Sequence, residues 1–123
     1  MEKVKRLRID KIVGKDDTAA YYGSGLLPVF ATPGMIALME KSAHLLAKTL
    51  LSEEEDTVGI EINVRHIRAT PIGAKVFAEA ILVKQEAKRF TFEIRAFDEK
   101  GEIGSGTHVR YMISPTKFME KLF

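Results

Sequence analysis

The sequence contains no cysteine, and this absence excludes several kinds of chemistry. Disulfide bonds, thiolate nucleophiles and cysteine-based metal sites are all impossible in this chain. The sequence also lacks an apolar run of the roughly 18 residues that a membrane-spanning helix needs. Its first residues mix charges and have no apolar stretch like that of a signal peptide. We therefore expect a cytoplasmic protein without a membrane segment.

A strong excess of one charge is lacking as well. The chain has 19 Lys and Arg residues against 17 Asp and Glu residues, a net charge of +2. This balance does not indicate a nucleic-acid or membrane-surface partner. No spacing of His, Asp and Glu indicates a metal site. Gly104-x-Gly106 lacks the third glycine and the following helix of a dinucleotide-binding loop. We predict neither a metal nor a cofactor.

The length of 123 residues is typical of one domain, and no repeat or linker divides it, so we expect a single domain over residues 1–123. The strongest helix signal runs from about Pro33 to Leu50. Thr32 is suited to the N-cap, and Pro33 to the first helical position, where its missing N–H costs nothing. Apolar residues at helical spacing, from Met35 to Leu50, predict a broad buried face.

Alternating apolar and polar residues predict five strands. They cover residues 4–13, 57–67, 75–84, 89–98 and 104–113, with a helical turn within 16–25 and a short helix after Pro115. The predicted buried faces carry Val58, Ile60, Ile62, Val64 and His66; Val76, Ala78, Ala80 and Leu82; Phe90, Phe92, Ile94 and Ala96; and Val109, Tyr111 and Ile113. Period-two segments joined by short turns form antiparallel hairpins, each with one buried face.

The order of these elements is β–α–β–β–β–β with one long helix. This is the hotdog arrangement, an α+β fold in which a central helix packs on an antiparallel sheet. The sheet has open edges, which proteins cover to avoid uncontrolled pairing. Pairing of two subunits at an edge is the expected solution, so we predict a homodimer or a tetramer built from it.

Three polar residues are candidates for chemistry. Glu40 lies on the apolar side of the helix, where it is either a helix-edge charge that reaches water or a functional carboxylate. His66 ends an apolar strand face, as either a structural histidine or a general base. Thr32 is either a simple N-cap or a hydroxyl that attacks an acyl carbon, or positions water there, beside a helix N-terminus that can hold an oxyanion.

The spacing permits these three residues to act together. Thr32 and Glu40 are eight residues apart, about 12 Å along a helix, so their side chains cannot touch directly. An imidazole between them, hydrogen-bonded on both sides, spans this distance once side-chain lengths are added. A Thr–His–Glu relay is therefore feasible, with groups supplied by one chain or by two.

The remaining histidines and arginines are weaker candidates. His44 is expected at the helix flank or in solvent, and His108 on the strand face opposite Val109. Arg65, Arg68 and Arg110 could meet phosphates, but exposed arginines on strands are usually only solvated.

The chain resembles the fluoroacetyl-CoA thioesterase-like branch of the hotdog superfamily. The motifs that carry the resemblance are Pro28-Val29-Phe30-Ala31-Thr32-Pro33, Ala37-Leu38-Met39-Glu40, Val58-Gly59, Val64-Arg65-His66, Thr70-Pro71-Ile72-Gly73 and Ile103-Gly104-Ser105-Gly106-Thr107-His108 with Arg110. These motifs cover nearly the whole chain in matching order and spacing.

The resemblance implies hydrolysis of an acyl-CoA in a homodimer, with the site between subunits and no cofactor beyond the CoA of the substrate. The catalytic residues of the family fall on Thr32, Glu40 and His66, and positions near the acyl group fall on Gly59 and Arg110. The fluoroacetyl-selective enzyme has a gating phenylalanine where this chain has Leu26. This difference indicates a short acyl-CoA other than fluoroacetyl-CoA.

Two other functions remain open from the sequence. The chain could be a non-catalytic module that binds an acyl-CoA or a similar small ligand, because a fold does not guarantee chemistry. It could also be a lyase or hydratase that acts on an enoyl-CoA, although the Asp and His pair usual for such enzymes is not evident. Release of a free thiol from an acyl-CoA separates a thioesterase from both.

Overall fold

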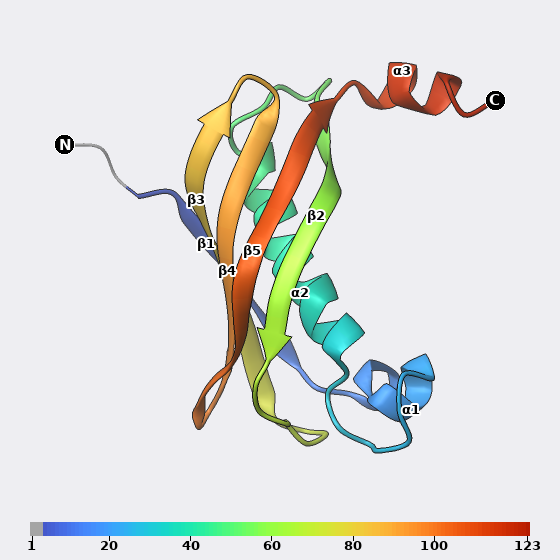
Figure 1. The fold of residues 1–123 in the computed structure, drawn as a ribbon, viewed down its shortest axis with the longest axis vertical. Coiled ribbons are helices and arrows are strands. Elements are labelled where there is room, and N and C mark those ends of the chain that lie inside the picture. Colours follow the sequence, from blue (N-terminus) through green and yellow to red (C-terminus); the bar gives the residue numbers. More distant parts are fainter. Residues whose placement is uncertain (1–3) are drawn as a thin grey trace.

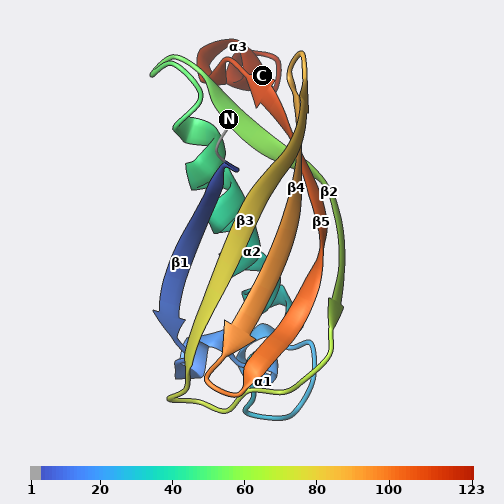
Figure 2. The same cartoon turned by 90° about the vertical axis from the view of Figure 1, so that its left-hand side faces the viewer.

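A long helix, α2 (Thr32–Lys48), lies against one face of a five-stranded antiparallel sheet (Figure 1). The computed structural model describes residues 4–123. The strands are β1 (Arg6–Ile12), β2 (Asp56–His66), β3 (Lys75–Glu86), β4 (Arg89–Asp98) and β5 (Gly101–Ile113), in the order β1-β3-β4-β5-β2. The short segments η1 (Lys15–Asp17) and α1 (Ala19–Tyr22) precede α2, and α3 (Pro115–Glu120) follows β5. Figure 2 shows the helix and the twisted sheet as two layers.

The hydrophobic core lies between α2 and the strands β3 and β4. The predicted inward faces of these two strands are confirmed, since all their predicted residues are buried except Leu82, which is half-buried against the core. From the helix come Met35, Met39 and Ala43, each fully buried. On β5, a glycine permits close approach of the helix, because a Cβ at Gly104 would lie 2.5 Å from the Met35 sulfur. The helix is thereby held close to the sheet at its N-terminal end.

The N-terminus of α2 differs from the prediction. Ala31, not Thr32, is the N-cap, and Thr32 is already the first helical residue. The chain is fixed one residue earlier, because Phe30 and Ala31 are buried and their N–H groups donate to the carbonyls of Thr70 and Asp17, at 2.8 Å each. The side chain of Thr32 is therefore not used for capping and is available for another partner.

The predicted face of β5 is turned away from the helix. His108 and Arg110 lie opposite Phe92 and Phe90 of β4, and directly opposed residues share a face of the sheet. Both polar residues therefore lie on the α2 side, with 1% and 7% exposure. Val109 and its alternate residues Tyr111 and Ile113 share the opposite face, so the prediction that these three form the core face was wrong.

The predicted alternation of side chains in β2 is interrupted by a β-bulge. The pairing of β2 with β5 shifts register between Gly59 and Glu61, so one extra residue enters β2 there. Beyond the bulge, Ile62, Val64 and His66 share the face of His108, as predicted. Before it, Val58 pairs with Tyr111 and lies on the other face. Strict alternation through the whole strand was therefore wrong.

The strand β2 forms one edge of the sheet and carries exposed apolar side chains. Ile60 and Ile62 are 51% and 38% exposed. In the pairing of the described residues, the outer side of β2 has no neighbouring strand. An open edge with apolar side chains is the kind of surface through which two sheets pair.

Candidate active site

Thr32 and His66 are in direct contact at one end of the molecule. Thr32 Oγ1 lies 2.8 Å from His66 Nδ1, a hydrogen bond that joins the first turn of α2 to the last residue of β2. Both residues line a cavity of about 320 Å³. The other walls are Ala19, Ser24, Val29, Phe30, Ala31, Ile67, Arg68 and Ala69. The structure thus brings two of the three predicted catalytic residues together beside a space that can admit a small group.

Burial sets the protonation of His66. Desolvation lowers the pKa of His66 below its usual 6.5, and the backbone of Arg68 opposes this effect in part. At neutral pH the ring is therefore uncharged. Its Nδ1 can accept the Thr32 hydroxyl hydrogen, which leaves the ring hydrogen on Nε2. This arrangement makes His66 suited to be a base for the Thr32 hydroxyl.

The other ring nitrogen of His66 is left without a partner. Nε2 is buried and forms no hydrogen bond with the described chain. A buried donor without an acceptor is rare in proteins and costs about 1–3 kcal/mol. The Nε2–H of His66 can therefore donate a hydrogen bond to a carboxylate from outside the chain.

The N-terminus of α2 opens on the same cavity. The first intrahelical bond that is evident runs from the Met35 N–H to the Ala31 carbonyl, at 2.9 Å. The N–H groups of Thr32 and Gly34 come before it and have no acceptor within the helix. Free N–H groups at a helix start stabilise a negative charge, such as the oxyanion of an acyl-transfer intermediate.

Glu40 does not join this pair within one chain. Its Oε2 lies 3.9 Å from His108 Nε2 and 4.0 Å from Arg110 Nη1. Along β5, His108 is four residues beyond Gly104, the partner of His66 in the sheet, a distance of about 13 Å. The expected relay is therefore formed only as far as the Thr32–His66 bond.

Glu40 instead faces a buried polar corner on β5 and β2. Arg110 donates from Nε to Thr57 Oγ1 at 2.8 Å and from Nη2 to the Thr57 carbonyl at 3.0 Å. Gly59 lies beside these groups, since a Cβ there would be 2.9 Å from Glu40 Oε2 and 3.1 Å from the ring of His108. Gly59 and Arg110, predicted near the acyl group, thus lie together, but next to Glu40 and not next to Thr32.

Thr57 and His108 were missed as members of this corner. The sequence did contain a signal for His108. It is two residues before Arg110 in a strand, and residues two apart lie on the same strand face. The other histidine outside the site, His44, bonds to Asp56 at 2.7 Å on the helix flank, as expected.

Leu26 does not reach either group of residues. It is 94% exposed in the loop between α1 and α2, and the cavity at Thr32 is lined by other residues. Its neighbour Leu27 is 65% exposed. The structure therefore shows an apolar loop at the end of the molecule near α1, with no contact between Leu26 and the cavity.

Comparison with known proteins identifies the family. A family model for fluoroacetyl-CoA-specific thioesterases matches residues 13–116. The chain is 39% identical over 94 residues to the fluoroacetyl-CoA thioesterase of Streptantibioticus cattleyicolor. The aligned segment covers 76% of this chain and 68% of that protein. The chain belongs to the fluoroacetyl-CoA-specific thioesterase family.

Two solved structures are similar to this chain, the first in sequence and fold and the second in fold alone. A variant of the fluoroacetyl-CoA-specific thioesterase FlK, in complex with fluoroacetate and CoA, has a TM-score of 0.88 at 33% identity over 96% of this chain and 99% of that chain. A hot-dog-like protein from Thermanaerovibrio acidaminovorans has a TM-score of 0.87 at 20% identity, over 97% and 88% of the two chains. The predicted hotdog fold and thioester-hydrolase class of this thioesterase family member are confirmed.

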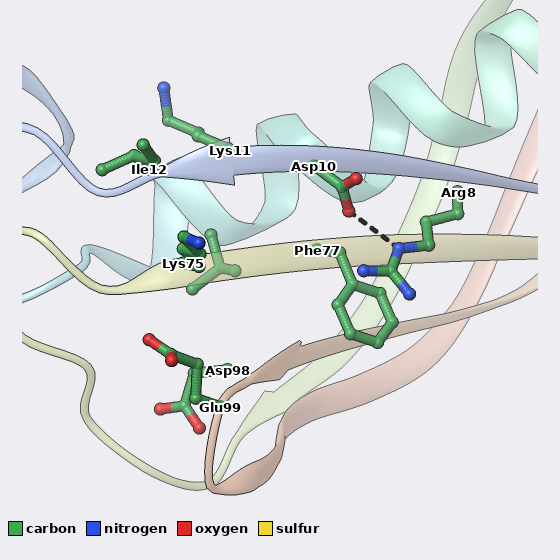
Figure 3. A pocket seen from close by; sticks show the side chains of 9 residues that line it. Arg8, Asp10, Lys11, Ile12, Lys75, Phe77, Asp98 and Glu99 are labelled. Carbon is green, nitrogen blue, oxygen red and sulfur yellow. Dashed lines mark hydrogen bonds and ion pairs between the residues drawn. The ribbon is translucent and has the colours of Figure 1, made fainter.

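A larger cavity of this thioesterase family member lies elsewhere and has a different character. It measures about 550 Å³ and is lined from β1, β3 and the β4–β5 turn (Figure 3). Arg8 bonds to Asp10 at 2.7 Å and stacks over the ring of Phe77, 3.6 Å from its centre. The lining includes no histidine, serine or threonine. It therefore has no hydroxyl and imidazole pair like that of Thr32 and His66 in the smaller cavity.

The described residues contain no group of three or more His, Cys, Asp and Glu side chains that could hold a metal ion. Among the helices within residues 4–123, none is long and apolar enough to cross a membrane.

Proposed function

We propose that this thioesterase cleaves a short acyl-CoA to the free acid and CoA, with Thr32 and His66 of one chain and Glu40 of a second copy forming the site. The observation that carries the proposal is the Thr32–His66 bond of 2.8 Å together with the unpartnered Nε2 of the same ring. One side of the imidazole faces a hydroxyl, and the other side needs an acceptor.

The chemistry follows from these atoms. His66 Nδ1 takes the proton of the Thr32 hydroxyl, or of a water held by it, as the oxygen attacks the thioester carbonyl. The carbonyl oxygen becomes an oxyanion beside the N–H groups at the start of α2. The C–S bond then breaks, and His66 returns the proton to the departing CoA sulfur. If Thr32 is the nucleophile, this step leaves acyl-Thr32, and a water then attacks the ester carbonyl with His66 as the base, which releases the acid and restores the hydroxyl. If water attacks directly, the acid forms in the first step with the same base.

A second copy supplies the missing carboxylate most simply through the edge strand β2. If two β2 strands pair antiparallel about a twofold axis near Asn63, His66 of one copy lies across from Ile60 of the other. Glu40 packs beside Gly59, next to that position. Such pairing also covers Ile60 and Ile62, which are exposed in the single chain. We therefore propose a homodimer, with a tetramer of such dimers as an extension.

Gly59, Arg110 and Leu26 are proposed to contact the acyl group. Gly59 leaves space beside Glu40, and Arg110 carries a buried positive charge next to that space. In the dimer this corner adjoins the Thr32–His66 pair of the other copy. Leu26 lies on the exposed loop near α1 and can reach the cavity only if that loop moves. The proposed mechanism needs no metal or redox cofactor, and a cytoplasmic location stays a prediction from the sequence.

The test is release of free thiol from a panel of acyl-CoAs, from acetyl-CoA upward and including fluoroacetyl-CoA. We expect hydrolysis of one or a few short members, and its loss in the Thr32→Ala and His66→Ala variants. His44→Ala is the matched control, since this histidine lies on the helix flank and should leave turnover unchanged. Saturable binding without thiol release would instead indicate a binding module. Loss of an enoyl chromophore with the thioester intact would indicate a hydratase.

A further inference from the structure

His108 is buried at 1% exposure and is not required by the proposed chemical steps. Both of its ring nitrogens have partners. Nδ1 lies 2.8 Å from the carbonyl oxygen of Glu61, and Nε2 lies 3.1 Å from Nη1 of Arg110. A carbonyl can only accept a hydrogen bond, and a guanidinium can only donate one. The ring is therefore neutral, with its hydrogen on Nδ1 and an acceptor lone pair on Nε2.

Nε2 of His108 is the third hydrogen-bond acceptor that holds the guanidinium of Arg110 in place. Thr57 accepts from Nε and Nη2 through its hydroxyl and its carbonyl. His108 accepts from Nη1, so each nitrogen of the guanidinium has a partner. The same Nη1 lies 4.0 Å from Glu40 Oε2. The orientation of the charge that faces Glu40 thus depends on the lone pair of His108.

We propose that His108 is a positioning residue, whose Nε2 holds the guanidinium of Arg110 toward Glu40 and toward the open space beside Gly59. The part of this inference that concerns turnover rests on the proposed function. The part that concerns the orientation of Arg110 does not depend on it.

The local shape of β2 supports this role. Glu61, whose carbonyl fixes the tautomer of His108, lies at the register shift of the β-bulge. Gly59 lies on the other side of the shift, and a Cβ there would be 3.1 Å from Cε1 of His108 and 2.9 Å from Glu40 Oε2. The bulge therefore supplies both the carbonyl that orients the ring and the space that admits the carboxylate.

An apolar ring of similar size would fill the same volume without this effect. Phe92 lies next to His108, with ring centres 6.3 Å apart, so the surroundings accept an aromatic ring. Phenylalanine at position 108 would leave Nη1 of a buried arginine without its acceptor. Such an unsatisfied charged donor costs more than the packing gains.

Two substitutions separate the positioning role from a purely structural one. The oxygen of Gln is as many bonds from Cβ as Nε2 of His, so His108→Gln retains an acceptor for Arg110. The amide of Asn matches Nδ1 instead, so His108→Asn retains only the bond to Glu61. We expect kcat/KM to fall about 10- to 100-fold in His108→Asn, as for loss of a hydrogen bond to a charged group, and only a few-fold in His108→Gln.

The reverse order of activity, with Asn better than Gln, would mean that His108 matters only as an anchor between β5 and β2. Melting temperatures are recorded for both variants, because a structural role predicts activities that follow stability. His44→Asn serves as the control for a histidine-to-asparagine change outside the site.

Nuclear magnetic resonance tests the inference without any substrate. In the unsubstituted protein, ¹⁵N shifts of His108 should show a protonated Nδ1 and an unprotonated Nε2; the opposite tautomer overturns the proposal even if a variant fails to fold. In His108→Asn, exchange of the Nη1 hydrogens of Arg110 with water should accelerate about tenfold, and in His108→Gln it should not. If these signals behave as expected while no acyl-CoA is hydrolysed, the proposed function fails and the positioning of Arg110 stands.

Discussion

The two halves of the sheet beneath α2 differ in what they present to the helix. Strands β3 and β4 present an unbroken apolar face, in which Ile94 and Ala96 are fully buried. Strands β5 and β2 present glycines and the polar residues His108 and Arg110 to the same helix. The first half packs as a hydrophobic core. The second half holds His66, Gly59 and Arg110 of the proposed site, next to an open sheet edge.

The difference teaches that stability and function are separated across one layer of this molecule. The apolar half gains free energy from burial that no second chain is needed to complete. The polar half is incomplete alone, since His66 Nε2 has no partner in the described chain and Glu40 is 41% exposed. Substitutions in the two halves should therefore change different measured quantities.

The largest effect on turnover is expected for His66→Ala in the polar half. Removal of a general base lowers the rate about 10²- to 10⁴-fold. The side chain is half-buried and forms one hydrogen bond, so the melting temperature should change little. Thiol-release kinetics and thermal unfolding of the same preparation measure both quantities. A variant that unfolds in parallel with its loss of activity would break the proposed separation.

Ile94→Ala tests the apolar half. Ile94 is fully buried and lies opposite Gly106, one residue pair along the same face from Phe92 and His108. Truncation of a buried isoleucine costs about 2–5 kcal/mol of unfolding free energy, because it removes apolar contact and leaves a cavity. Denaturant unfolding measures this loss, while kcat/KM of the protein that stays folded should be unchanged within a few-fold. A large fall in kcat/KM at full folding would contradict the division.

The apolar half is also the part that the sequence predicted well. Alternation in residues 75–84 and 89–98 identified which side chains of β3 and β4 face the helix, because the inward residues from Val76 to Leu82 and from Phe90 to Ala96 are all apolar. The long helix followed from its stripe and from Pro33. These signals are local, since burial against a helix requires only a periodic apolar face.

The polar half was predicted less well, for physical reasons that differ between residues. The bulge beyond Gly59 changes the face of Val58, and a bulge leaves no periodic signal. His108 and Arg110 are inward because they form hydrogen bonds with one another and with Thr57, and periodicity treats them as outward. Glu40 and His66 are far apart within one chain, so the predicted contact between them requires a second copy. The spacing of residues along one sequence gives no information on how two copies pair.

Gly59→Ala sharpens the comparison within the polar half. The added methyl group would lie 2.9 Å from Glu40 Oε2, which is closer than real contacts allow. Overpacking typically costs about 1–3 kcal/mol, and here the flexible carboxylate can move aside, so stability should fall by the lower figure. Displacement of Glu40 from its position should lower kcat/KM about tenfold, which corresponds to a loss of about 1.4 kcal/mol of transition-state stabilisation. Gly73→Ala, at a turn with nothing within 4 Å, is a control for the methyl group that also strains the backbone. Turnover equal to that of the unsubstituted protein would place Glu40 outside the reaction.

The smallest effect expected is a dependence of stability on pH, between pH 7.5 and about 5, that originates in the histidines of the polar half. Burial lowers the pKa of His66 and of His108 below the usual 6.5, and these rings are neutral in the folded protein near neutral pH. As pH falls below about 6.5, the unfolded chain binds protons at these histidines before the folded chain does, so the free energy of unfolding decreases. The decrease ends once pH is below the folded pKa values. Thermal unfolding between pH 7.5 and about 5 should show this slope, with at most 1.36 kcal/mol lost per pH unit for each histidine.

His66→Asn should reduce the slope, because it removes one of the two buried rings, while Ile94→Ala should lower stability equally at each pH. An unchanged slope in His66→Asn would mean that the pKa of His66 is the same in the folded and the unfolded protein, which contradicts the lowering by burial.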